Sequence, residues 1–386
     1  MANILFIAYD FPPILSPESI QVQRRAVTLA NNGHRVVVLT SHTNTAFEFI
    51  DESLIKKHEK IEVIRTKRPY FEKPLNLFFK FYDLTDRKLW WKTEALNKAV
   101  KILQSENIDV IYTHSTPLVD HIVGLELKRG FPNTRWIAHF SDPWTLNPYK
   151  TYRFNWQFKL NREYETKILK GCDLLTVTSI KTKELFEKEF RFLDGKVVVL
   201  PHTYDESLYE QKEIKRDKKI IVHTGNIYGL RTIKHLLRAI KNSDFNDLEF
   251  HFYGRVKKDE ADLAKELGLQ EVVKFFGQVG YFESIKKICE ADFLLVVDAP
   301  LKNSVFFPSK LADYIGAKKP IMALTPKDST TADILDEIGC NKFVANSDDE
   351  DEIKEMLKRV NESIVLKKYE KYSMKNYEFL RRVFER

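Results

Sequence analysis

The sequence predicts an α/β protein built from two Rossmann-like, doubly wound domains that face a cleft. Three observations support this prediction. Short apolar runs rich in β-branched residues recur along the chain, amphipathic segments with helical spacing separate them, and the pattern starts again near residue 219. Such near-continuous hydrophobic runs are typical of parallel strands that are covered on both faces. Strands that alternate with helices predict parallel sheets with right-handed crossovers.

The strands are expected at the apolar runs, in chain order. Those of the first half are 3–9, 35–40, 61–66, 110–114, 136–140, 174–178 and 197–200. Those of the second half are 219–223, 248–253, 272–276, 293–297, 320–324 and 342–345. Pro17-Glu18-Ser19 is a start signal for the first helix, and Asn32-Gly33 supplies its stop.

The domain boundary is expected in the charged segment 204–218, which lacks an apolar face. We therefore predict a first domain over 1–203 and a second over 204–361, followed by a charged helix over 362–386. Ligands of doubly wound sheets bind beyond the carboxyl ends of the strands, so the loops after each strand are the places to look for a site.

Composition narrows the class of protein. The chain has 386 residues, of which 43% are hydrophobic and 30% charged, as in an ordinary globular protein. The net charge of +7 favours an anionic ligand or surface but is too small for a dedicated nucleic-acid binder. Three widely spaced cysteines fit neither a metal site nor a disulfide framework, which predicts buried thiols in a reducing compartment.

The chain is expected to be cytoplasmic. Its first residues lack a basic segment, Asp10 interrupts the first apolar run, and no apolar stretch is long enough to span a bilayer. The sequence is also compatible with peripheral contact between the chain and a membrane surface. The segment 65–91 is basic and then strongly aromatic, a composition suited to a membrane interface, although a core helix with a charged outer face would also explain it.

The strongest local signal in the second half lies at 307–320. Pro308 precedes a short helix, and Ser309 is expected to cap it. Free N–H groups in the first turn, the helix dipole and Lys310 would together form an anion site suited to a diphosphate. Asp313, one turn further on, is placed to accept a hydrogen bond from a ribose hydroxyl. An ordinary helix with a solvated lysine is the alternative.

Two further strand ends in the second half carry cations. Gly225 and Gly229 would let the turn through Asn226 pass close to a ligand, and Arg231 could clamp a phosphate. Arg255 also follows a strand, although taken alone it is better explained as a surface arginine. No Walker motif and no G-x-G-x-x-G fingerprint follows either opening strand, which counts against P-loop enzymes and NAD-dependent dehydrogenases.

Polar residues also end the strands of the first half. His139 and Asp142 follow or end a buried strand, where they could position a substrate or transfer a proton. The alternative is an Asp-Pro turn beside packing tryptophans. His114 and His121 flank the preceding strand–helix junction, and each taken alone is better explained as a structural histidine.

Taken together, these segments resemble bacterial glycosyltransferases of the GT-B fold, in particular family 4, the retaining group used in surface-glycan assembly. The similarity covers most of the chain. The segments that carry it are 4–13, 33–40, 109–111, 117–124, 142–144, 225–231, 276–279 and 308–320. In this family a terminal helix crosses back onto the first domain, and the resemblance implies the same for 362–386.

The resemblance implies a donor site in the second domain. Arg231 and Lys310 would hold the diphosphate of a nucleotide sugar, 276–279 would line the base, and Asp313 would bond the ribose in place of the second glutamate of the family's Glu-x7-Glu element. The full expected donor-binding set is Gly225, Asn226, Arg231, Arg255, Gly277, Gln278, Val279, Ser309, Lys310 and Asp313.

On the acceptor side the resemblance implies a role for Asp142, which with Arg231 and Lys310 makes up the expected catalytic set. The expected acceptor-side residues are Ser16, His114 and His139. Three positions depart from the family pattern. Val305 replaces the first glutamate of the Glu-x7-Glu element, 14–17 replaces a Gly-Gly pair, and Ser141 replaces a histidine.

These features imply a metal-independent, retaining transfer of a hexosyl or N-acetylhexosaminyl group. The donor would be a nucleoside-diphosphate sugar, most often of uridine, and the acceptor a glycan or lipid-linked sugar of lipopolysaccharide, O-antigen or capsule. No cofactor and no nucleic-acid partner is expected. A non-catalytic nucleotide-sugar-binding or scaffold protein, and a GT-B sugar-nucleotide epimerase, remain alternatives.

Overall fold

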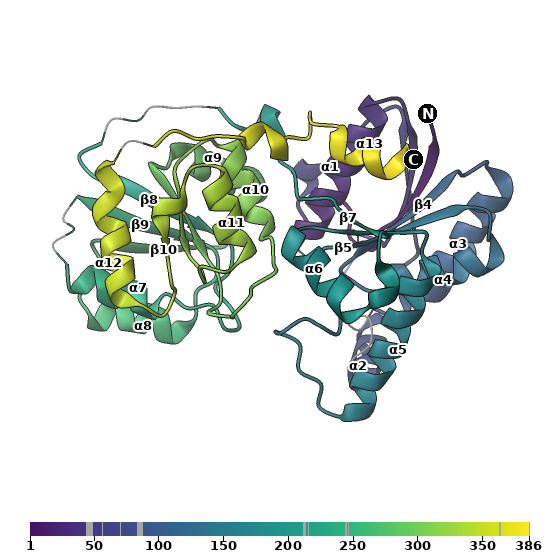
Figure 1. The fold of residues 1–386 in the computed structure, drawn as a ribbon, viewed down its shortest axis with the longest axis horizontal. Coiled ribbons are helices and arrows are strands. Elements are labelled where there is room, and N and C mark those ends of the chain that lie inside the picture. Colours follow the sequence, from purple (N-terminus) through teal and green to yellow (C-terminus); the bar gives the residue numbers. More distant parts are fainter. Residues whose placement is uncertain are drawn as a thin grey trace. The chain divides into compact units, whose positions relative to one another are not determined.

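The computed structural model describes residues 1–43, 49–55, 57–69, 71–82, 88–210, 214, 216–243, 245, 247–362 and 364–385. It divides the chain into two compact units (Figure 1). The first contains Met1–Pro201 together with Tyr377–Arg386, and the second contains His202–Asn376. Each is an α/β layer structure, described by itself below.

The first unit is built on a seven-stranded parallel sheet of order β3-β2-β1-β4-β5-β6-β7. The strands are β1 (Asn3–Ile7), β2 (Arg35–Thr40), β3 (Ile61–Arg65), β4 (Val110–Ser115), β5 (Arg135–Phe140), β6 (Leu174–Val177) and β7 (Val197–Val199). The order reverses between β1 and β4, which are paired in register from Ile4 with Val110. In doubly wound sheets this switch point is where ligands bind.

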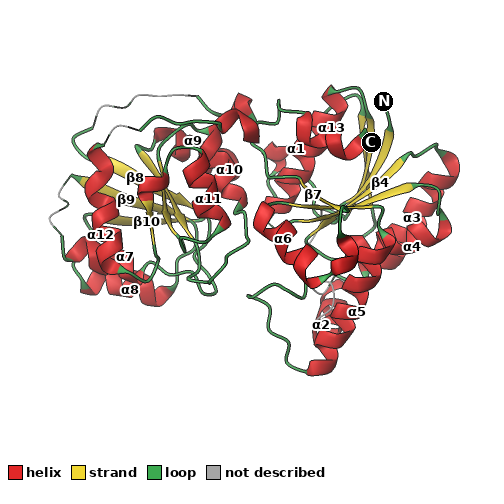
Figure 2. Cartoon of the chain, in the orientation of Figure 1, coloured by secondary structure: helices red, strands yellow, loops and turns green. Residues whose placement is uncertain are grey.

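Helices cover both faces of this sheet (Figure 2). The helices of this unit are α1 (Pro17–Asn31), α2 (Glu72–Tyr82), α3 (Trp91–Ser105), α4 (Val119–Gly130), α5 (Asn155–Gly171), α6 (Ile180–Glu189) and α13 (Glu378–Phe384), with short 3-10 turns at Glu52–Leu54 and Arg191–Leu193. Of these, α2 lies beside the far end of α5 rather than on the sheet (Figure 2). Alternate residues of β1 belong to different cores: Leu5 and Ile7 pack with α3 to α6, and Ile4 and Phe6 pack with α1 and α13.

The second unit has a six-stranded parallel sheet of order β10-β9-β8-β11-β12-β13. Its strands are β8 (Lys219–Thr224), β9 (Leu248–Tyr253), β10 (Val273–Gly277), β11 (Phe293–Val297), β12 (Ile321–Leu324) and β13 (Val344–Ala345). Its helices are α7 (Lys234–Lys241), α8 (Lys258–Glu266), α9 (Tyr281–Glu290), α10 (Ser309–Gly316), α11 (Thr330–Glu337) and α12 (Glu350–Lys358). Short 3-10 turns lie at Glu206–Leu208, Asn341–Phe343, Arg359–Asn361 and Tyr369–Tyr372.

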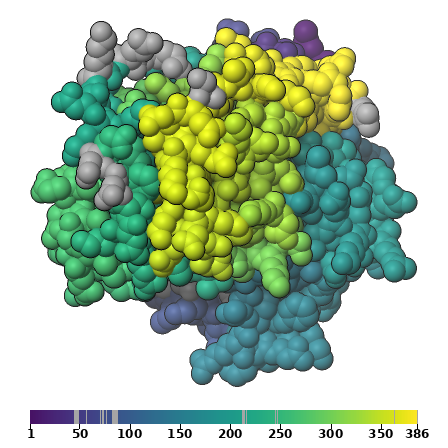
Figure 3. All heavy atoms as spheres, turned by 60° about the vertical axis from the view of Figure 1, so that its left-hand side comes forward, coloured from purple at the N-terminus to yellow at the C-terminus, as the bar shows by residue number. Residues whose placement is uncertain are grey.

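The predicted helix over 362–386 is too long, although residues 377–386 do return to the first unit as expected. Within the described residues this stretch contains only the turn Tyr369–Tyr372 and α13, and Figure 3 shows the yellow C-terminal residues at the surface of the molecule. The cause is that its backbone bonds to distant partners. Lys367 N–H donates to Ile338 O, and Tyr204 exchanges backbone bonds with Tyr372 and Met374, which leaves those groups unavailable to a helix.

Helix α13 belongs to the first unit although it closes the chain. Leu380, Val383 and Phe384 are buried in the core beneath α1, and the Phe384 ring lies 5.5 Å from that of Tyr112 and 6.4 Å from that of Phe6. The three cysteines are buried and unpaired, as predicted. Among the described residues no helix is long and apolar enough to cross a membrane.

Candidate active site

A cationic cluster lies in the second unit where β8 and β11 end and α10 begins. Lys310, in the first turn of α10, places its Nζ 3.2 Å from His223 Nε2. The other ring nitrogen, His223 Nδ1, lies 2.8 Å from the backbone oxygen of Leu295. Because a carbonyl oxygen can only accept, Nδ1 carries the proton and Nε2 accepts from the lysine ammonium. His223 therefore fixes Lys310 at the carboxyl end of the sheet.

Two glycines let this lysine approach the neighbouring loops. Gly225 has φ +95°, and a Cβ atom there would lie 2.9 Å from Lys310 Nζ. Gly254 has φ +147°, and a Cβ atom on it would lie 2.2 Å from Gly225 O. Asn226 Oδ1 accepts from Arg255 N–H at 2.8 Å and ties the loops after β8 and β9 together. A side chain at Gly254 would force these two loops apart, and one at Gly225 would displace the lysine.

The cluster is electrostatically prepared for an anion. Burial and the nearby charge of Arg231 lower the pKa of Lys310 to about 7, while Asp298 opposes the shift. Burial and the Lys310 charge also hold the pKa of His223 well below its ordinary value. Arg231 lies with its guanidinium carbon 4.9 Å from the Tyr228 ring centroid. A dianionic diphosphate would relieve the repulsion between these cations.

A second polar cluster lies in the first unit, at the carboxyl ends of β4 and β5. His114 Nδ1 is 2.9 Å from Arg25 Nη1, and its Nε2 is hydrogen-bonded to Glu18. Since arginine can only donate, His114 accepts at Nδ1 and donates from Nε2 to the carboxylate. Ser141 Oγ donates to the same Glu18 oxygen at 2.8 Å, and Arg25 also donates to Tyr112 OH at 3.0 Å.

This second cluster carries an unusual carboxyl group. Burial raises the pKa of Glu18 to about 7, while the hydrogen bond from Ser141 and the charge of Arg25 oppose the shift. The Glu18 side chain keeps 15% of its surface exposed. Burial and Arg25 hold the pKa of His114 well below its ordinary value, so the ring is neutral at pH 7. A half-protonated, partly exposed carboxyl group at a sheet's ligand-binding edge suits recognition of a hydroxyl.

Comparison with known proteins identifies a family whose model matches this chain. Residues 20–208, about half of the chain, match the model of the family described as Glycosyltransferase Family 4. Curated protein sequences give no match.

Solved structures share the architecture across both units. Sucrose-phosphate synthase from Thermosynechococcus elongatus aligns with a TM-score of 0.67 at 16% identity, over 93% of this chain and 90% of that one. WaaG, a glycosyltransferase involved in lipopolysaccharide biosynthesis, aligns with a TM-score of 0.60 at 15% identity, over 99% and 95%. Trehalose-6-phosphate from E. coli bound with UDP-2-fluoro glucose gives 0.62 at 12%, over 100% and 96%.

The chain is a family 4-like glycosyltransferase of the GT-B fold. Its two Rossmann-like units are the two domains expected of that fold. In this glycosyltransferase the Lys310 cluster lies in the second unit and the Glu18 cluster in the first.

One detail of the predicted donor site is wrong in the glycosyltransferase structure. Ser309 does not cap α10: Pro308, at φ −60° and ψ 125°, takes the cap position, and no side chain accepts from the first turn. The reason is that α10 starts one residue earlier than its sequence signal suggests. Ser309 and Lys310 are thus the first two residues of the helix, and their N–H groups point out of its uncapped start.

Asp313 is already engaged by aromatic hydroxyls. Its Oδ1 accepts from Tyr209 OH at 2.7 Å and from Tyr281 OH at 3.1 Å, so residues from three distant parts of the second unit's sequence meet here. A ribose bound at Asp313 would share the carboxylate with these two tyrosines. Neither tyrosine was predicted from the sequence, because nothing local connects residues 209, 281 and 313.

The loop after β10 carries the predicted base-lining residues. Gly277 ends β10 at φ +75° and makes an isolated bridge to Gly254, so the loops after β8, β9 and β10 lie side by side. Gln278 is exposed and Val279 half-buried. Phe276, half exposed, stacks on Tyr253 with ring centroids 4.6 Å apart, which gives the edge a flat aromatic face.

The predicted acceptor-side residues divide into two groups. His114 belongs to the Glu18 cluster, and His139 stacks on it with ring centroids 4.8 Å apart. Ser16 instead caps α1, where it accepts from Ser19 N–H and donates to Asp10. Asp142 is half-buried directly after β5.

His121 has a structural role. Its Nδ1 bonds to Thr113 Oγ1 at 2.8 Å, and its ring stacks on Phe140. Burial lowers its pKa to about 3, so it does not titrate near neutrality.

Two contributors to the site escaped prediction. In the sequence, Glu18 was recognised only as part of a helix start signal, because its partners His114 and Ser141 are about a hundred residues away. Lys257 Nζ donates to the backbone oxygens of Gly229 and Arg231 at 2.9 and 2.7 Å and so holds the arginine's loop. Over the described residues, no cluster of three or more His, Cys, Asp or Glu side chains is arranged to hold a metal ion.

Proposed function

We propose that the protein is a retaining glycosyltransferase that transfers a hexosyl or N-acetylhexosaminyl group from a nucleoside-diphosphate sugar. A UDP-sugar is the favoured donor, and a glycan or lipid-linked sugar of bacterial lipopolysaccharide, O-antigen or capsule is the acceptor. The observation that carries the proposal is the Lys310, Arg231 and His223 cluster at the carboxyl ends of β8 and β11, beside an uncapped helix start.

The charge balance of the reaction explains why this cluster is needed. The bond between the sugar's anomeric carbon and the diphosphate oxygen breaks, and its electron pair stays on the leaving oxygen. Lys310, Arg231 and the first N–H groups of α10 would stabilise that charge as fixed, preorganised donors. The acceptor oxygen forms the new bond on the same face, and its proton passes to the leaving phosphate. This route needs no protein base, and we expect it to proceed without a metal ion.

A non-catalytic nucleotide-sugar binder is the second candidate, and one observation favours it. Val305, buried before α10, occupies the position where the family has a carboxylate that contacts the donor sugar. Such a protein would bind donor without transferring it. A sugar-nucleotide epimerase would in addition release an epimerised sugar, which product analysis detects.

We expect the protein to work at the cytoplasmic face of a membrane, with contact through 65–91. Helix α2 in this range presents Leu77, Phe78 and Phe81 to solvent. Residues 70 and 83–87 of the range lie outside the described residues.

The test is a thermal-shift panel of the purified chain against UDP, GDP, ADP, CMP and dTDP, alone and as sugar conjugates. A ligand at a hundred times its Kd adds about 2.7 kcal/mol of stability. We expect one nucleotide class to stabilise the wild type and not Lys310→Ala, and turnover in Lys310→Ala to fall at least ~10²-fold. No shift with any nucleotide would contradict the proposal; a shift without turnover would favour the binding protein.

A further inference from the structure

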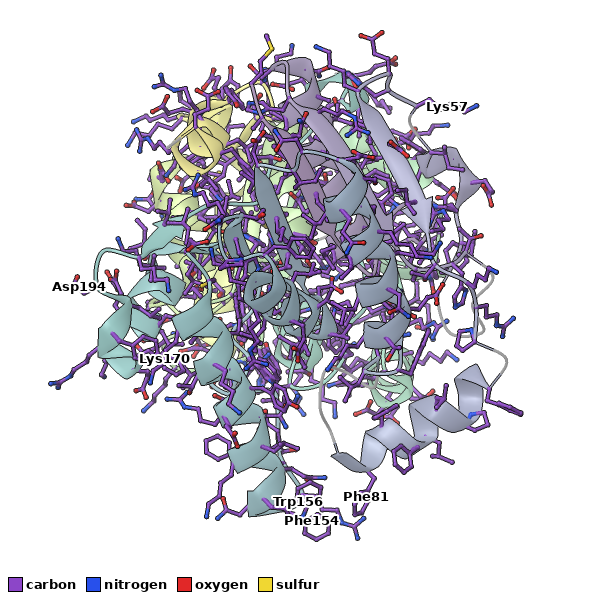
Figure 4. All side chains as sticks on the ribbon, turned by 90° about the vertical axis from the view of Figure 1, so that its right-hand side faces the viewer. Lys57, Phe81, Phe154, Trp156, Lys170 and Asp194 are labelled. Atoms are coloured by element: carbon purple, nitrogen blue, oxygen red, sulfur yellow. The ribbon has the colours of Figure 1, made fainter. Side chains whose placement is uncertain are left out.

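Exposed aromatic rings gather at one end of the first unit. Figure 4 shows Phe81 from the end of α2 and Phe154 and Trp156 from the start of α5 pointing into solvent at the same tip. Phe81 is 60% exposed, and Phe154 and Trp156 are each 40% exposed. Large apolar groups this exposed, from two elements far apart in sequence, are unusual on a monomeric protein and mark an interaction surface. The members of this aromatic tip are Phe81, Phe154 and Trp156, and Leu77 and Phe78 of α2 and Phe158 of α5 are also exposed.

The two elements are joined rather than merely adjacent. Gln157 Nε2 donates to Phe81 O at 2.6 Å, while its Oε1 accepts from Phe154 N–H at 3.0 Å. The Phe81 and Trp156 rings lie 5.6 Å apart, and Phe154 stacks on Trp156 with an interplanar angle of 12°. The buried amide of Gln157 therefore fixes the aromatic tip as one surface.

Cations border the aromatic tip. The guanidinium carbon of Arg153 lies 5.2 Å from the Phe154 ring centroid, and Lys80 of α2 is exposed. Along α5, from Phe158 onward, runs a groove of about 420 Å³. Its lining residues are Phe158, Lys159, Arg162, Glu163, Thr166, Lys167 and Lys170. The groove thus has four cations against one acid, and that acid is paired with Lys167.

We propose that the aromatic tip and the α5 groove together dock the protein onto an anionic lipid bilayer. The rings would lie at the acyl boundary, and Lys159 and Lys170 would contact lipid phosphates. This deepens the membrane contact put forward for 65–91, on which it rests, by adding α5 as its second half and an anionic headgroup as its ligand.

The charges favour a bilayer over a second copy of the chain. A twofold dimer through this surface would place the cations of α5 opposite the same cations of its partner, which is unfavourable. An anionic bilayer instead satisfies both parts at once, because basic side chains are attracted to its surface potential and aromatic rings are stable at its interface.

Trp156 makes the proposal testable without a substrate. It is the exposed tryptophan of the chain's five: Trp91, Trp136 and Trp144 are buried and Trp90 is half-buried. We expect its emission to shift to the blue when the full chain meets vesicles of equimolar phosphatidylcholine and phosphatidylglycerol, and brominated lipid to quench it. Trp156→Phe should abolish the shift while co-sedimentation with the vesicles persists.

Matched variants separate the two parts of the surface. Phe81→Ser with Phe154→Ser should weaken vesicle binding at least about tenfold, since two rings are withdrawn from the interface. Ile180→Ser, which removes an exposed apolar side chain from α6 of the same unit, should not. Lys159→Glu with Lys170→Glu should remove the preference for phosphatidylglycerol, whereas Lys101→Glu on α3 should leave it intact.

Two results would overturn the proposal. The first is that the protein fails to bind vesicles although a nucleotide still raises its melting temperature. This result would reject the proposed lipid-binding surface without contradicting the proposed donor site. The other is a concentration-dependent dimer, seen by light scattering, that Phe81→Ser with Phe154→Ser abolishes. That would assign the aromatic tip to a second copy of the chain.

Discussion

Lys310 is the residue on which the donor site depends, and its environment makes donor binding sensitive to pH. In the free protein burial and Arg231 bring its pKa to about 7, so the ammonium is half lost at neutrality. A diphosphate binds the charged form. The affinity for the diphosphate should therefore be highest below pH 7. It should fall as the pH rises above 7, by at most about tenfold per pH unit.

Calorimetry with a UDP-sugar between pH 6 and pH 9 would measure this effect, since the diphosphate diester does not itself titrate there. Lys310→Arg is the control because a guanidinium stays protonated throughout. An unchanged pH slope in Lys310→Arg would assign the titration to another group.

Glu18 illustrates at the same scale what a sequence cannot supply. Its chemistry comes from burial beside Ser141 and His114, and each contact spans roughly a hundred residues. Residues 307–320, by contrast, were identifiable because Pro308, Lys310 and the following apolar spacing are all local. Features formed within one segment can thus be anticipated from the sequence, whereas contacts made where several strands meet cannot.

At the scale of the element, the loop after β8 depends on its first glycine. Gly225→Ala would put a methyl group 2.9 Å from Lys310 Nζ in a left-handed backbone conformation. The backbone alone costs about 1–2 kcal/mol. Because the lysine must also move, we expect loss of the nucleotide-induced thermal shift.

Gly268→Ala is the matched control for this variant. Gly268 also has a positive φ, +71°, but nothing lies within 4 Å of its Cβ position. The Gly268→Ala variant should be destabilised by a similar amount and should keep the nucleotide-induced thermal shift. Equal nucleotide responses in the two variants would show that close approach at Gly225 is not needed for donor binding.

Most elements were predictable because apolar runs are a local property. Each of the thirteen predicted runs contains or overlaps a strand among the described residues, within one or two residues at most ends. The errors are of another kind. The start of α10 differs by one residue, and the predicted helix over 362–386 is reduced to α13, because Tyr204 and Ile338 supply backbone partners to residues 367–374. Neither partner is visible from the segment itself.

At the scale of the whole molecule, the ten residues from Tyr377 contribute to the stability of the first unit. Removing them would expose the core face that Leu380, Val383 and Phe384 cover. At about 1.5–3 kcal/mol per buried side chain, the loss is on the order of 5 kcal/mol, a large share of the stability of a domain.

We therefore expect a chain ending at Asn376 to unfold in two steps on urea titration, with the first unit melting early. Phe384→Ala should reproduce much of this loss, at about 3–5 kcal/mol. Arg382→Ala, which removes an exposed ion pair with Glu378, should change little. A truncated chain with the wild-type urea midpoint would rule out this role for α13.

The path of the chain has a consequence for its synthesis. The first unit takes its last helix from the far end of the sequence, so the second unit is in effect inserted between two pieces of the first. A ribosome delivers those pieces about 175 residues apart. The apolar face under α1 therefore stays uncovered while the second unit is being synthesised. Although synthesis of the first unit starts first, that unit is completed only after the second one.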